Sequence, residues 1–483
     1  MHTPPYTPTP PHTPAYIGGK HIDGAETYDN IDPADGRSLG TVIRSGRREI
    51  DLAVEAAGAA QPGWYATPVA DRAVALTRLA DAITAESETL ARLESEDTGK
   101  PIGQARADAA VCARYFQFYG HAIDTYYGDT IPVRPGIQAY TTREPFGVTG
   151  HIVAWNYPMQ LFARGVAPAI ATGNCAVVKP ADETPRTAVR LAELATAAGL
   201  PDGVINIVPG IGAEAGAALT AHGGVRQVGF VGSTAVGAQV AHAAAERVVP
   251  ATLELGGKSA HVVFPDADLD AAAEAVTKGI LQNAGQTCSA GSRLIVHRDA
   301  HDALVARLTA AFSAVRIGPG ADDPDLGPLV SRKQQARVAG FLDGLTSGEV
   351  LVGGAAPDDQ RLGEGAYFAP TLVDGVDPGS RLAQEEVFGP VLAVMSFDRP
   401  EEAVRLANST PYALMGAVWA SDISRALTTA RGIEAGQVYV NAFGAGGGVE
   451  FPFGGFRGSG YGREKGVEAL DAYTQSKTFI IKL

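Results

Sequence analysis

The chain has 483 residues, which is too long for one ordinary hydrophobic core and long enough for two or three domains. Its composition, 45% hydrophobic and 19% charged, is typical of a globular protein and excludes a chain that is disordered throughout. The formal net charge of -14 argues against nucleic acid or an anionic membrane surface as a partner, so we expect a small-molecule ligand.

The three cysteines, Cys112, Cys175 and Cys288, are an odd and sparse set for a chain of this size. Such a set does not resemble a disulfide framework, and it favours a reducing, cytoplasmic compartment. No run of about 18 apolar residues occurs, so we expect no membrane span. Residues 1–15 are rich in Pro and Thr and lack the features of a secretory signal, so they are predicted to be a disordered tail.

The first predicted elements are helices in an Ala-rich stretch, residues 48–118, where apolar residues recur mostly at steps of three and four. Residues 126–146 follow with β-branched and aromatic side chains between turn formers, and this pattern predicts a hairpin.

Short apolar runs then alternate with helical patterns. Predicted strands before residue 255 cover residues 148–155, 176–179, 205–208, 227–231 and 252–255, with helices near 186–198, 214–221 and 236–245. After residue 255 the predicted strands are 261–264, 293–297, 367–373, 391–396, 417–420 and 437–440, with helices near 269–285 and 302–315. This alternation predicts two consecutive α/β domains, each a doubly wound parallel sheet with helices on both faces.

The last residues, 473–483, are β-prone and contain a run of apolar side chains from Phe479 to Ile481. They predict an edge strand, and an exposed apolar edge aggregates unless another strand covers it. We therefore expect this edge to pair with another subunit.

Cys288 is the first candidate for chemistry. It lies among small and polar residues in the segment NAGQTCS, residues 283–289. A cysteine nucleophile must be partly ionised, and a carboxylate or a histidine normally supplies the base. The alternative is a buried, unreactive thiol, and we interpret Cys112 and Cys175 in that way.

Two polar residues follow predicted strands. Glu254 ends an apolar strand and precedes Gly256 and Gly257, so its carboxylate would reach the crevice where parallel strands end. Partial burial would raise its pKa and make it a base near neutral pH, whereas the alternative is a solvated loop carboxylate. Asn156 could donate its amide to an oxyanion, and its alternative is a turn residue before Pro158.

Further segments could bind a dinucleotide. Lys179 and Asp182 follow a buried strand and would suit a ribose diol. The segment GFVGSTAVG, residues 229–237, is typical of a strand, a glycine turn and a helix start that could bind a pyrophosphate. The segments EEVFGP (385–390) and PFGGFRGSGYGRE (452–464), taken alone, would be a solvated acidic turn and a flexible loop.

These segments, in this order, resemble the NAD(P)-dependent, non-acylating aldehyde dehydrogenase superfamily from about residue 16 to the C-terminus. The resemblance implies NAD-dependent oxidation of an aldehyde to a carboxylic acid, with Cys288 as the nucleophile that forms a thioester. It also implies that Asn156 and the Cys288 backbone N–H hold the oxyanion. Glu254 would then activate the water that hydrolyses the thioester.

The same resemblance implies the coenzyme contacts, which are Trp155, Lys179, Asp182, Gly232, Ser233, Glu386 and Phe388. No metal is expected at the site. The implied domains are a coenzyme-binding domain over residues 16–123 and 145–255, and a catalytic domain over 256–456. Residues 124–144 and 470–483 would form a small β arm that assembles a homodimer or a homotetramer.

Three alternatives stay open. Asp182 is one methylene shorter than the family's usual glutamate, so NADP is an alternative to NAD. Arg164 would lie just over two helical turns after Asn156 and could bind a semialdehyde carboxylate, although pairing with an internal carboxylate is the favoured alternative. A cysteine ester hydrolase is the alternative of another class, but His261, the histidine nearest to Glu254, lies on a predicted buried strand.

Overall fold

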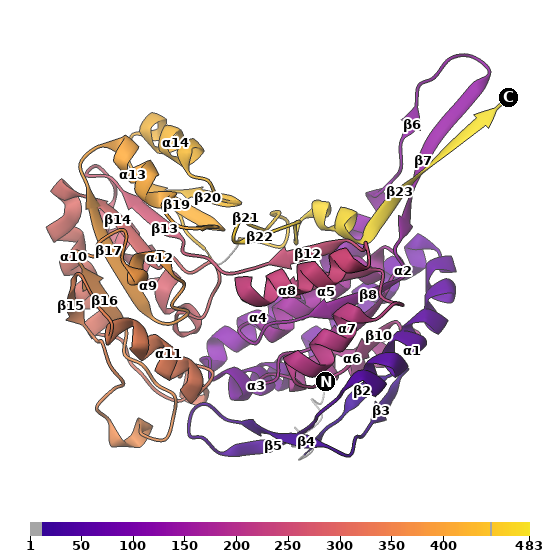
Figure 1. Cartoon of the computed structure of the whole chain (residues 1–483), viewed down its shortest axis with the longest axis horizontal. Helices are drawn as coiled ribbons and strands as arrows, with labels where there is room; N and C mark the ends of the chain where they lie inside the picture. Colours follow the sequence, from indigo (N-terminus) through magenta and orange to yellow (C-terminus); the bar gives the residue numbers. More distant parts are fainter. Residues whose placement is uncertain (1–11, 445–446) are drawn as a thin grey trace.

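The computed structural model of the chain describes residues 12–444 and 447–483, which form two α/β lobes and a projecting arm (Figure 1). Most of the predicted N-terminal tail, residues 1–11, lies outside the described residues. The described end of that predicted tail is structured: β1 (His12–Thr13) pairs with β5 (Ser38–Ile43), and β2 (Ala15–Ile17) is buried. The apolar side chains of β2 supply the core contacts that a Pro- and Thr-rich stretch lacks.

The first lobe contains an eight-stranded sheet with the order β22-β12-β11-β8-β9-β10-β2-β3. The strands from β12 to β10 run parallel, and those at either edge pair antiparallel. Beyond β2, the strands are β3 (Lys20–Ile22), β8 (Val148–Ile152), β9 (Cys175–Lys179), β10 (Ile205–Ile207), β11 (Gln227–Val231), β12 (Ala251–Glu254) and β22 (Gly460–Tyr461).

The predicted helical stretch over residues 48–118 is divided into α1 (Arg47–Ala66), α2 (Val69–Ala85), α3 (Ser87–Thr98) and α4 (Ile102–Ala122). Pro68 and Pro101 precede α2 and α4, where the missing N–H does no harm, and Gly99 ends α3 with a φ of 77°. The other helices of this lobe are α5 (Pro158–Ala171), α6 (Arg186–Ala197), a π-helical turn (Gly212–Gly216), α7 (Ala217–Ala221) and α8 (Thr234–Glu246).

The second lobe contains a seven-stranded sheet with the order β15-β16-β17-β14-β13-β19-β20, parallel except for β15. Its strands are β13 (Ala260–Val263), β14 (Arg293–His297), β15 (Glu349–Val352), β16 (Thr371–Asp374), β17 (Val391–Phe397), β19 (Met415–Trp419) and β20 (Gln437–Val440). Its helices are α9 (Leu269–Leu281), α10 (Arg298–Ser313), α11 (Arg332–Leu342), α12 (Arg381–Gln384), α13 (Pro400–Ala407) and α14 (Ile423–Gly432).

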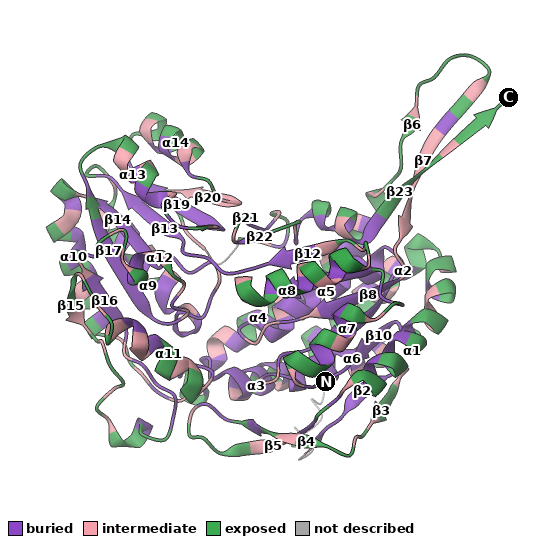
Figure 2. Cartoon of the chain, in the orientation of Figure 1, coloured by how far each residue is buried: buried purple, intermediate pink, exposed green. Residues whose placement is uncertain are grey.

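Each lobe has its own hydrophobic core around its sheet. Figure 2 shows the central strands of both sheets buried, whereas the outer faces of the helices and most of the arm are exposed. This separation agrees with the prediction of two consecutive α/β units.

The strand order of the first sheet changes direction between β8 and β11. The chain proceeds from β8 to β9 and β10 on one side, and then returns to β11 and β12 on the other. The crevice at such a switch point, beyond the carboxyl ends of the strands, is where open α/β sheets bind ligands. Asn156 follows β8 and Gly232 follows β11, so this topology brings two predicted site segments together.

The arm is a three-stranded sheet of β6 (Thr130–Ile131), β7 (Ile137–Pro145) and β23 (Thr474–Lys482), and it projects away from both lobes (Figure 1). The strand β7 is central, so β6 and β23 form its edges. No helix of the described residues is long and apolar enough to cross a membrane.

Candidate active site

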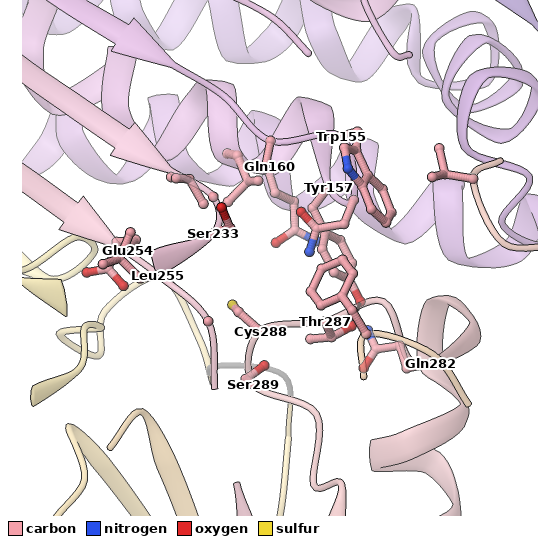
Figure 3. A pocket seen from close by; sticks show the side chains of 18 of the residues that line it. Trp155, Tyr157, Gln160, Ser233, Glu254, Leu255, Gln282, Thr287, Cys288 and Ser289 are labelled. Carbon is pink, nitrogen blue, oxygen red and sulfur yellow. Dashed lines mark hydrogen bonds between the residues drawn. The ribbon is translucent and has the colours of Figure 1, made fainter. Parts of the chain in front are cut away.

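A cavity of about 660 Å³ lies between the two lobes, and it is lined by residues of both. Its volume is within the usual range for a small-molecule site. The three predicted catalytic residues, Asn156, Glu254 and Cys288, all line it. Figure 3 shows Glu254 and Cys288 among the side chains around this cavity. The structure therefore brings together a side chain that follows β8, one at the end of β12 and one in the loop before β14.

Only some of the predicted coenzyme residues line this cavity. Those that line it are Trp155, Gly232, Ser233, Glu386 and Phe388. Lys179 and Asp182 do not line it, although the neighbouring Glu183 does. The residues expected at one end of a dinucleotide thus lie just beyond the wall of the cavity.

A strained turn positions Cys288. Asn283, Ala284 and Gly285 have φ values of 50°, 54° and 73°, a run in the left-handed region that side chains rarely adopt. A Cβ on Gly285 would lie 2.2 Å from the Gly389 carbonyl oxygen, so only glycine fits there. The turn directs the chain out of α9 and leaves the sulfur of Cys288 facing the cavity (Figure 3).

The thiol of Cys288 is protonated at neutral pH in this state. Burial is the main cause that raises its pKa to about 12; the Arg164 guanidinium opposes this rise, and the Glu386 and Glu254 carboxylates add to it. Burial likewise raises the pKa of Cys175 to about 12. Access to the cavity, and not an already ionised thiol, therefore distinguishes Cys288 from the other cysteines.

Asn156 is tied to the loop that carries Cys288. Its side-chain Nδ2 donates to the Gln286 carbonyl oxygen at 2.9 Å, and the Asn283 side chain donates to the Asn156 carbonyl oxygen at 2.8 Å. One of the two amide hydrogens of Asn156 is used in this way, so the other is available at the wall of the cavity.

Glu254 ends β12 and lies opposite Val231 of β11. Neither of its carboxylate oxygens has a hydrogen-bond partner among the described residues. Burial, followed by the neighbouring Glu464 carboxylate, raises the pKa of Glu254 well above its usual value, while Arg164 lowers it. A Cβ on Gly257 would lie 2.2 Å from the Cys288 carbonyl oxygen, so glycine allows the turn after β12 to approach the nucleophile loop.

The remaining coenzyme candidates form polar contacts along the same crevice. Lys179 forms an ion pair with Asp182, whose other oxygen accepts from the Gly212 N–H at 3.3 Å. Ser233 caps the N-terminus of α8, accepting from the Val236 N–H at 3.4 Å. A helix start of this kind presents backbone N–H groups and a partial positive charge to an anion.

Glu386 and Phe388 line the cavity from the second lobe, between α12 and β17. Glu386 accepts from the Gly257 N–H at 2.9 Å, and burial raises its pKa to about 7. Phe388 packs edge-to-face against Trp155 with ring centroids 5.1 Å apart. Gln334 of α11, which the sequence analysis did not identify, donates to the Phe388 carbonyl oxygen at 2.7 Å and also lines the cavity.

Comparisons with known proteins identify the family of this chain. A model of the aldehyde dehydrogenase family matches residues 21–479. The chain belongs to the aldehyde dehydrogenase family. A hydroxyisobutyraldehyde dehydrogenase from Mycolicibacterium austroafricanum is 39% identical to it over 99% of this chain and 95% of the relative.

Solved structures of similar proteins have the same fold. A Burkholderia cenocepacia protein assigned to the aldehyde dehydrogenases is 50% identical, with a TM-score of 0.95 over 97% of this chain and 100% of that one. An indole-3-acetaldehyde dehydrogenase variant from P. syringae, crystallised with NAD+, is 39% identical, with a TM-score of 0.95 over 97% and 96% of the two chains. The fold class predicted from the sequence is therefore confirmed.

Three charged or aromatic residues that the sequence analysis gave no role lie at or beside this aldehyde dehydrogenase cavity: Phe453 and Lys465 line it, and Glu464 contacts Arg164 of its wall. Glu464 pairs with Arg164 at 2.5 Å, and both side chains are buried. Arg164 lies 4.5 Å from the centroid of the Phe453 ring, and the Lys465 amine lies 5.3 Å from the same centroid. The sequence feature that could have indicated these residues is the adjacent charged pair Glu464 and Lys465 at the end of the glycine-rich segment.

Proposed function

We propose that the chain oxidises an aldehyde to a carboxylic acid with NAD, through a thioester on Cys288. The observation that carries this proposal is the convergence of Cys288, Asn156 and Glu254 on one cavity. Membership of the aldehyde dehydrogenase family supports the same reaction class.

The wall of the cavity fits a dinucleotide. The start of α8 at Ser233 suits a pyrophosphate, and the buried Glu386 carboxylate suits the hydroxyls of a ribose. The edge-to-face pair of Trp155 and Phe388 offers an apolar surface beside them. The P. syringae relative crystallised with NAD+ supports NAD as the coenzyme.

In the first half-reaction, Cys288 loses its proton and adds to the aldehyde carbon, which becomes tetrahedral. The free amide hydrogen of Asn156 and the Cys288 backbone N–H would hold the oxygen that becomes negative, a role worth about 3 kcal/mol per donor. NAD, when bound, accepts the hydride that this tetrahedral carbon releases. The product that stays on the protein is a thioester of Cys288.

In the second half-reaction, Glu254 removes a proton from the water that attacks the thioester. A buried carboxylate with a raised pKa is a stronger base than an exposed one, so it suits this step near neutral pH. Arg164 opposes the rise in pKa, so its guanidinium favours the ionised form of Glu254 that acts as a base. Glu254 also argues against the acylating type of enzyme, which transfers the thioester to coenzyme A and lacks this glutamate.

We propose NAD rather than NADP because Asp182 lies at the expected adenosine-ribose end. A carboxylate there would repel a 2′-phosphate and accept from ribose hydroxyls. Its ion pair with Lys179 weakens this repulsion, so the preference is a ratio rather than an absolute exclusion.

The charges of the cavity favour an uncharged aldehyde over a semialdehyde. Glu464 already neutralises Arg164, the residue that would bind a distal carboxylate. Lys465 is a weak substitute, because burial lowers its pKa to about 7. The named substrates of the relatives, hydroxyisobutyraldehyde and indole-3-acetaldehyde, carry no carboxylate.

A cysteine ester hydrolase is disfavoured because no histidine lines the described part of the cavity. The test is an assay of NADH formation with a panel of aldehydes, with and without coenzyme A. We expect NADH and a free carboxylic acid without coenzyme A. Ester hydrolysis with no NADH from any aldehyde, or turnover that requires coenzyme A, would contradict the proposal.

We also propose that the arm assembles a homodimer or a homotetramer. The outer edge of β23 has no partner strand within the described chain, and Ile480 at that edge is 73% exposed. A flat apolar edge of this kind is a pairing site for a second strand.

A further inference from the structure

A fully buried lysine lies beneath the cavity, and neither half-reaction uses it. Lys100 follows α3, and its side chain is 0% exposed. Its amine donates to Glu94 Oε1 at 2.7 Å, to Asp108 Oδ2 and to the carbonyl oxygen of Asn156 at 3.0 Å. An ammonium group has three hydrogens, so these contacts satisfy it completely.

The Asn156 contact connects this lysine to the nucleophile loop. The same carbonyl oxygen accepts from the Asn283 side chain at 2.8 Å, so both of its lone pairs are occupied. With the peptide fixed in this way, the Asn156 side chain retains only its own rotamer freedom. The hydrogen bond to the Gln286 carbonyl oxygen then fixes the direction of the second amide hydrogen.

The charges of the cluster balance without any exposed group. Burial opposes the charged form of Lys100, but the Asp108 and Glu94 carboxylates outweigh this effect and raise its pKa, so it stays cationic. Burial, opposed by Lys100, raises the pKa of Glu94 to about 8. The cluster is therefore a buried cation held between two carboxyl groups.

The carboxyl groups extend the same framework to α5. Glu94 accepts from the Met159 N–H at 3.2 Å, and Asp108 accepts from the Gln160 side chain at 2.6 Å. Both donors belong to the first turn of α5, directly after Asn156. Buried ion pairs rarely stabilise a fold more than apolar residues of similar volume would, so a role in positioning accounts better for this cluster.

We propose that Lys100 is a positioning residue that pre-orients the Asn156 amide for the oxyanion through the Asn156 carbonyl group. This proposal rests on the proposed role of Asn156 as an oxyanion donor. Donors fixed before the reaction stabilise developing charge without reorganisation, so loss of the lysine should lower kcat and leave NAD binding unchanged.

The test is a double-mutant cycle between Lys100 and Asn156. Lys100→Met alone would leave Asp108 buried without a cation, so it is combined with Asp108→Asn, and Asp108→Asn alone is the reference. We expect the added Lys100→Met change to lower kcat about 10- to 100-fold, with the Kd for NAD unchanged. Asn156→Ala should lower kcat about 100- to 1000-fold.

The deciding comparison is the Lys100→Met effect in the Asn156→Ala background, where we expect less than about a threefold loss. An equal loss in both backgrounds, or an unchanged kcat for Lys100→Met, would overturn the positioning role. A wild-type rate for Asn156→Ala would instead overturn the role of Asn156 and this proposal with it. Arg186→Met combined with Asp97→Asn, measured against Asp97→Asn alone, is the matched control, because Arg186 is a buried cation whose side-chain hydrogen bonds in the described chain go to α3 rather than to Asn156. Its effect should be the same with and without Asn156.

Discussion

At the scale of single residues, the three cysteines differ in access rather than in acidity. Burial raises the pKa of both Cys175 and Cys288 to about 12, and that of Cys112 well above its usual value. Cys112 and Cys175 are completely buried in the first lobe, whereas Cys288 borders the cavity. We therefore expect the reactive cysteine to be Cys288, because it is the one that borders the cavity.

Cys288→Ser should lower the rate of NADH formation by about three orders of magnitude or more, because a serine alkoxide is inaccessible near neutral pH without a strong base. NAD binding should be retained. Cys112→Ser and Cys175→Ser are matched controls that should stay within about threefold of the wild-type rate. The opposite pattern, an active Cys288→Ser and an inactive control, would show that the nucleophile is misassigned.

Arg164 is the residue at which the structure decides between two interpretations of the sequence. The internal carboxylate that was favoured as its partner is Glu464. Breaking a buried ion pair on one side typically costs about 3–5 kcal/mol, because it leaves an uncompensated charge.

We therefore expect Arg164→Ala to lower the melting temperature, and Arg164→Met combined with Glu464→Gln to recover most of that loss. Wild type and Arg164→Met/Glu464→Gln should both prefer a neutral aldehyde to succinic semialdehyde of similar length, as judged by kcat/KM. A wild-type preference for the semialdehyde that disappears in these variants would mean that Arg164 binds substrate.

At the scale of elements, the strands of the two parallel sheets were the most predictable part. The predicted strands at 293–297 and 437–440 have the same bounds as β14 and β20. These are continuous apolar runs between turn formers, so local sequence alone determines them. The strand predicted over 148–155 ends at Ile152, because the residues after it leave the sheet to reach the site.

Other elements depend on contacts that the local sequence does not contain. The strand predicted over 367–373 begins only at Thr371, after Pro370, which cannot donate to a neighbouring strand. The short strands β3, β4 (Thr27–Ile31) and β5 and the helix α11 were not predicted, because their apolar periodicity is weak. The family resemblance implied that the arm hairpin and the C-terminal strand combine, and the structure adds their antiparallel register, in which β23 pairs with β7 along its whole length.

The arm gives a prediction at this scale. Ile480→Lys should shift the protein toward monomer in size-exclusion chromatography with light scattering, because a charge at the open edge of β23 opposes strand pairing. Ile423→Lys, an exposed apolar residue at the start of α14, is the matched control and should leave the mass unchanged. A monomeric wild type, or equal masses for both variants and wild type, would exclude assembly through β23.

At the scale of the whole molecule, the site is made from segments that are distant in the sequence. Local sequence patterns made Asn156, Glu254 and Cys288 candidates, since each lies near a strand end or a glycine, and the family resemblance supplied their expected roles. They could not identify the partners that arrange these residues. Lys100 reaches the site only because α4 packs against both α3 and α5, and Glu464 only because β22 pairs with β12.

The proposed reaction depends on a thioester on Cys288 that Glu254 helps to hydrolyse. Glu254→Gln should release a burst of about one NADH per active site and then stall. In wild type the hydrolysis step should accelerate as pH rises through the raised pKa of Glu254, because only its ionised form is a base, and the variant should lose that dependence.

The most direct measurement is the mass of the stalled Glu254→Gln protein after reaction with NAD and an aldehyde. We expect the peptide that contains Cys288 to gain the mass of one acyl group, and we expect hydroxylamine to remove this group. Full steady-state turnover with no acyl group on Cys288, or an acyl group on Cys112 or Cys175, would contradict this expectation.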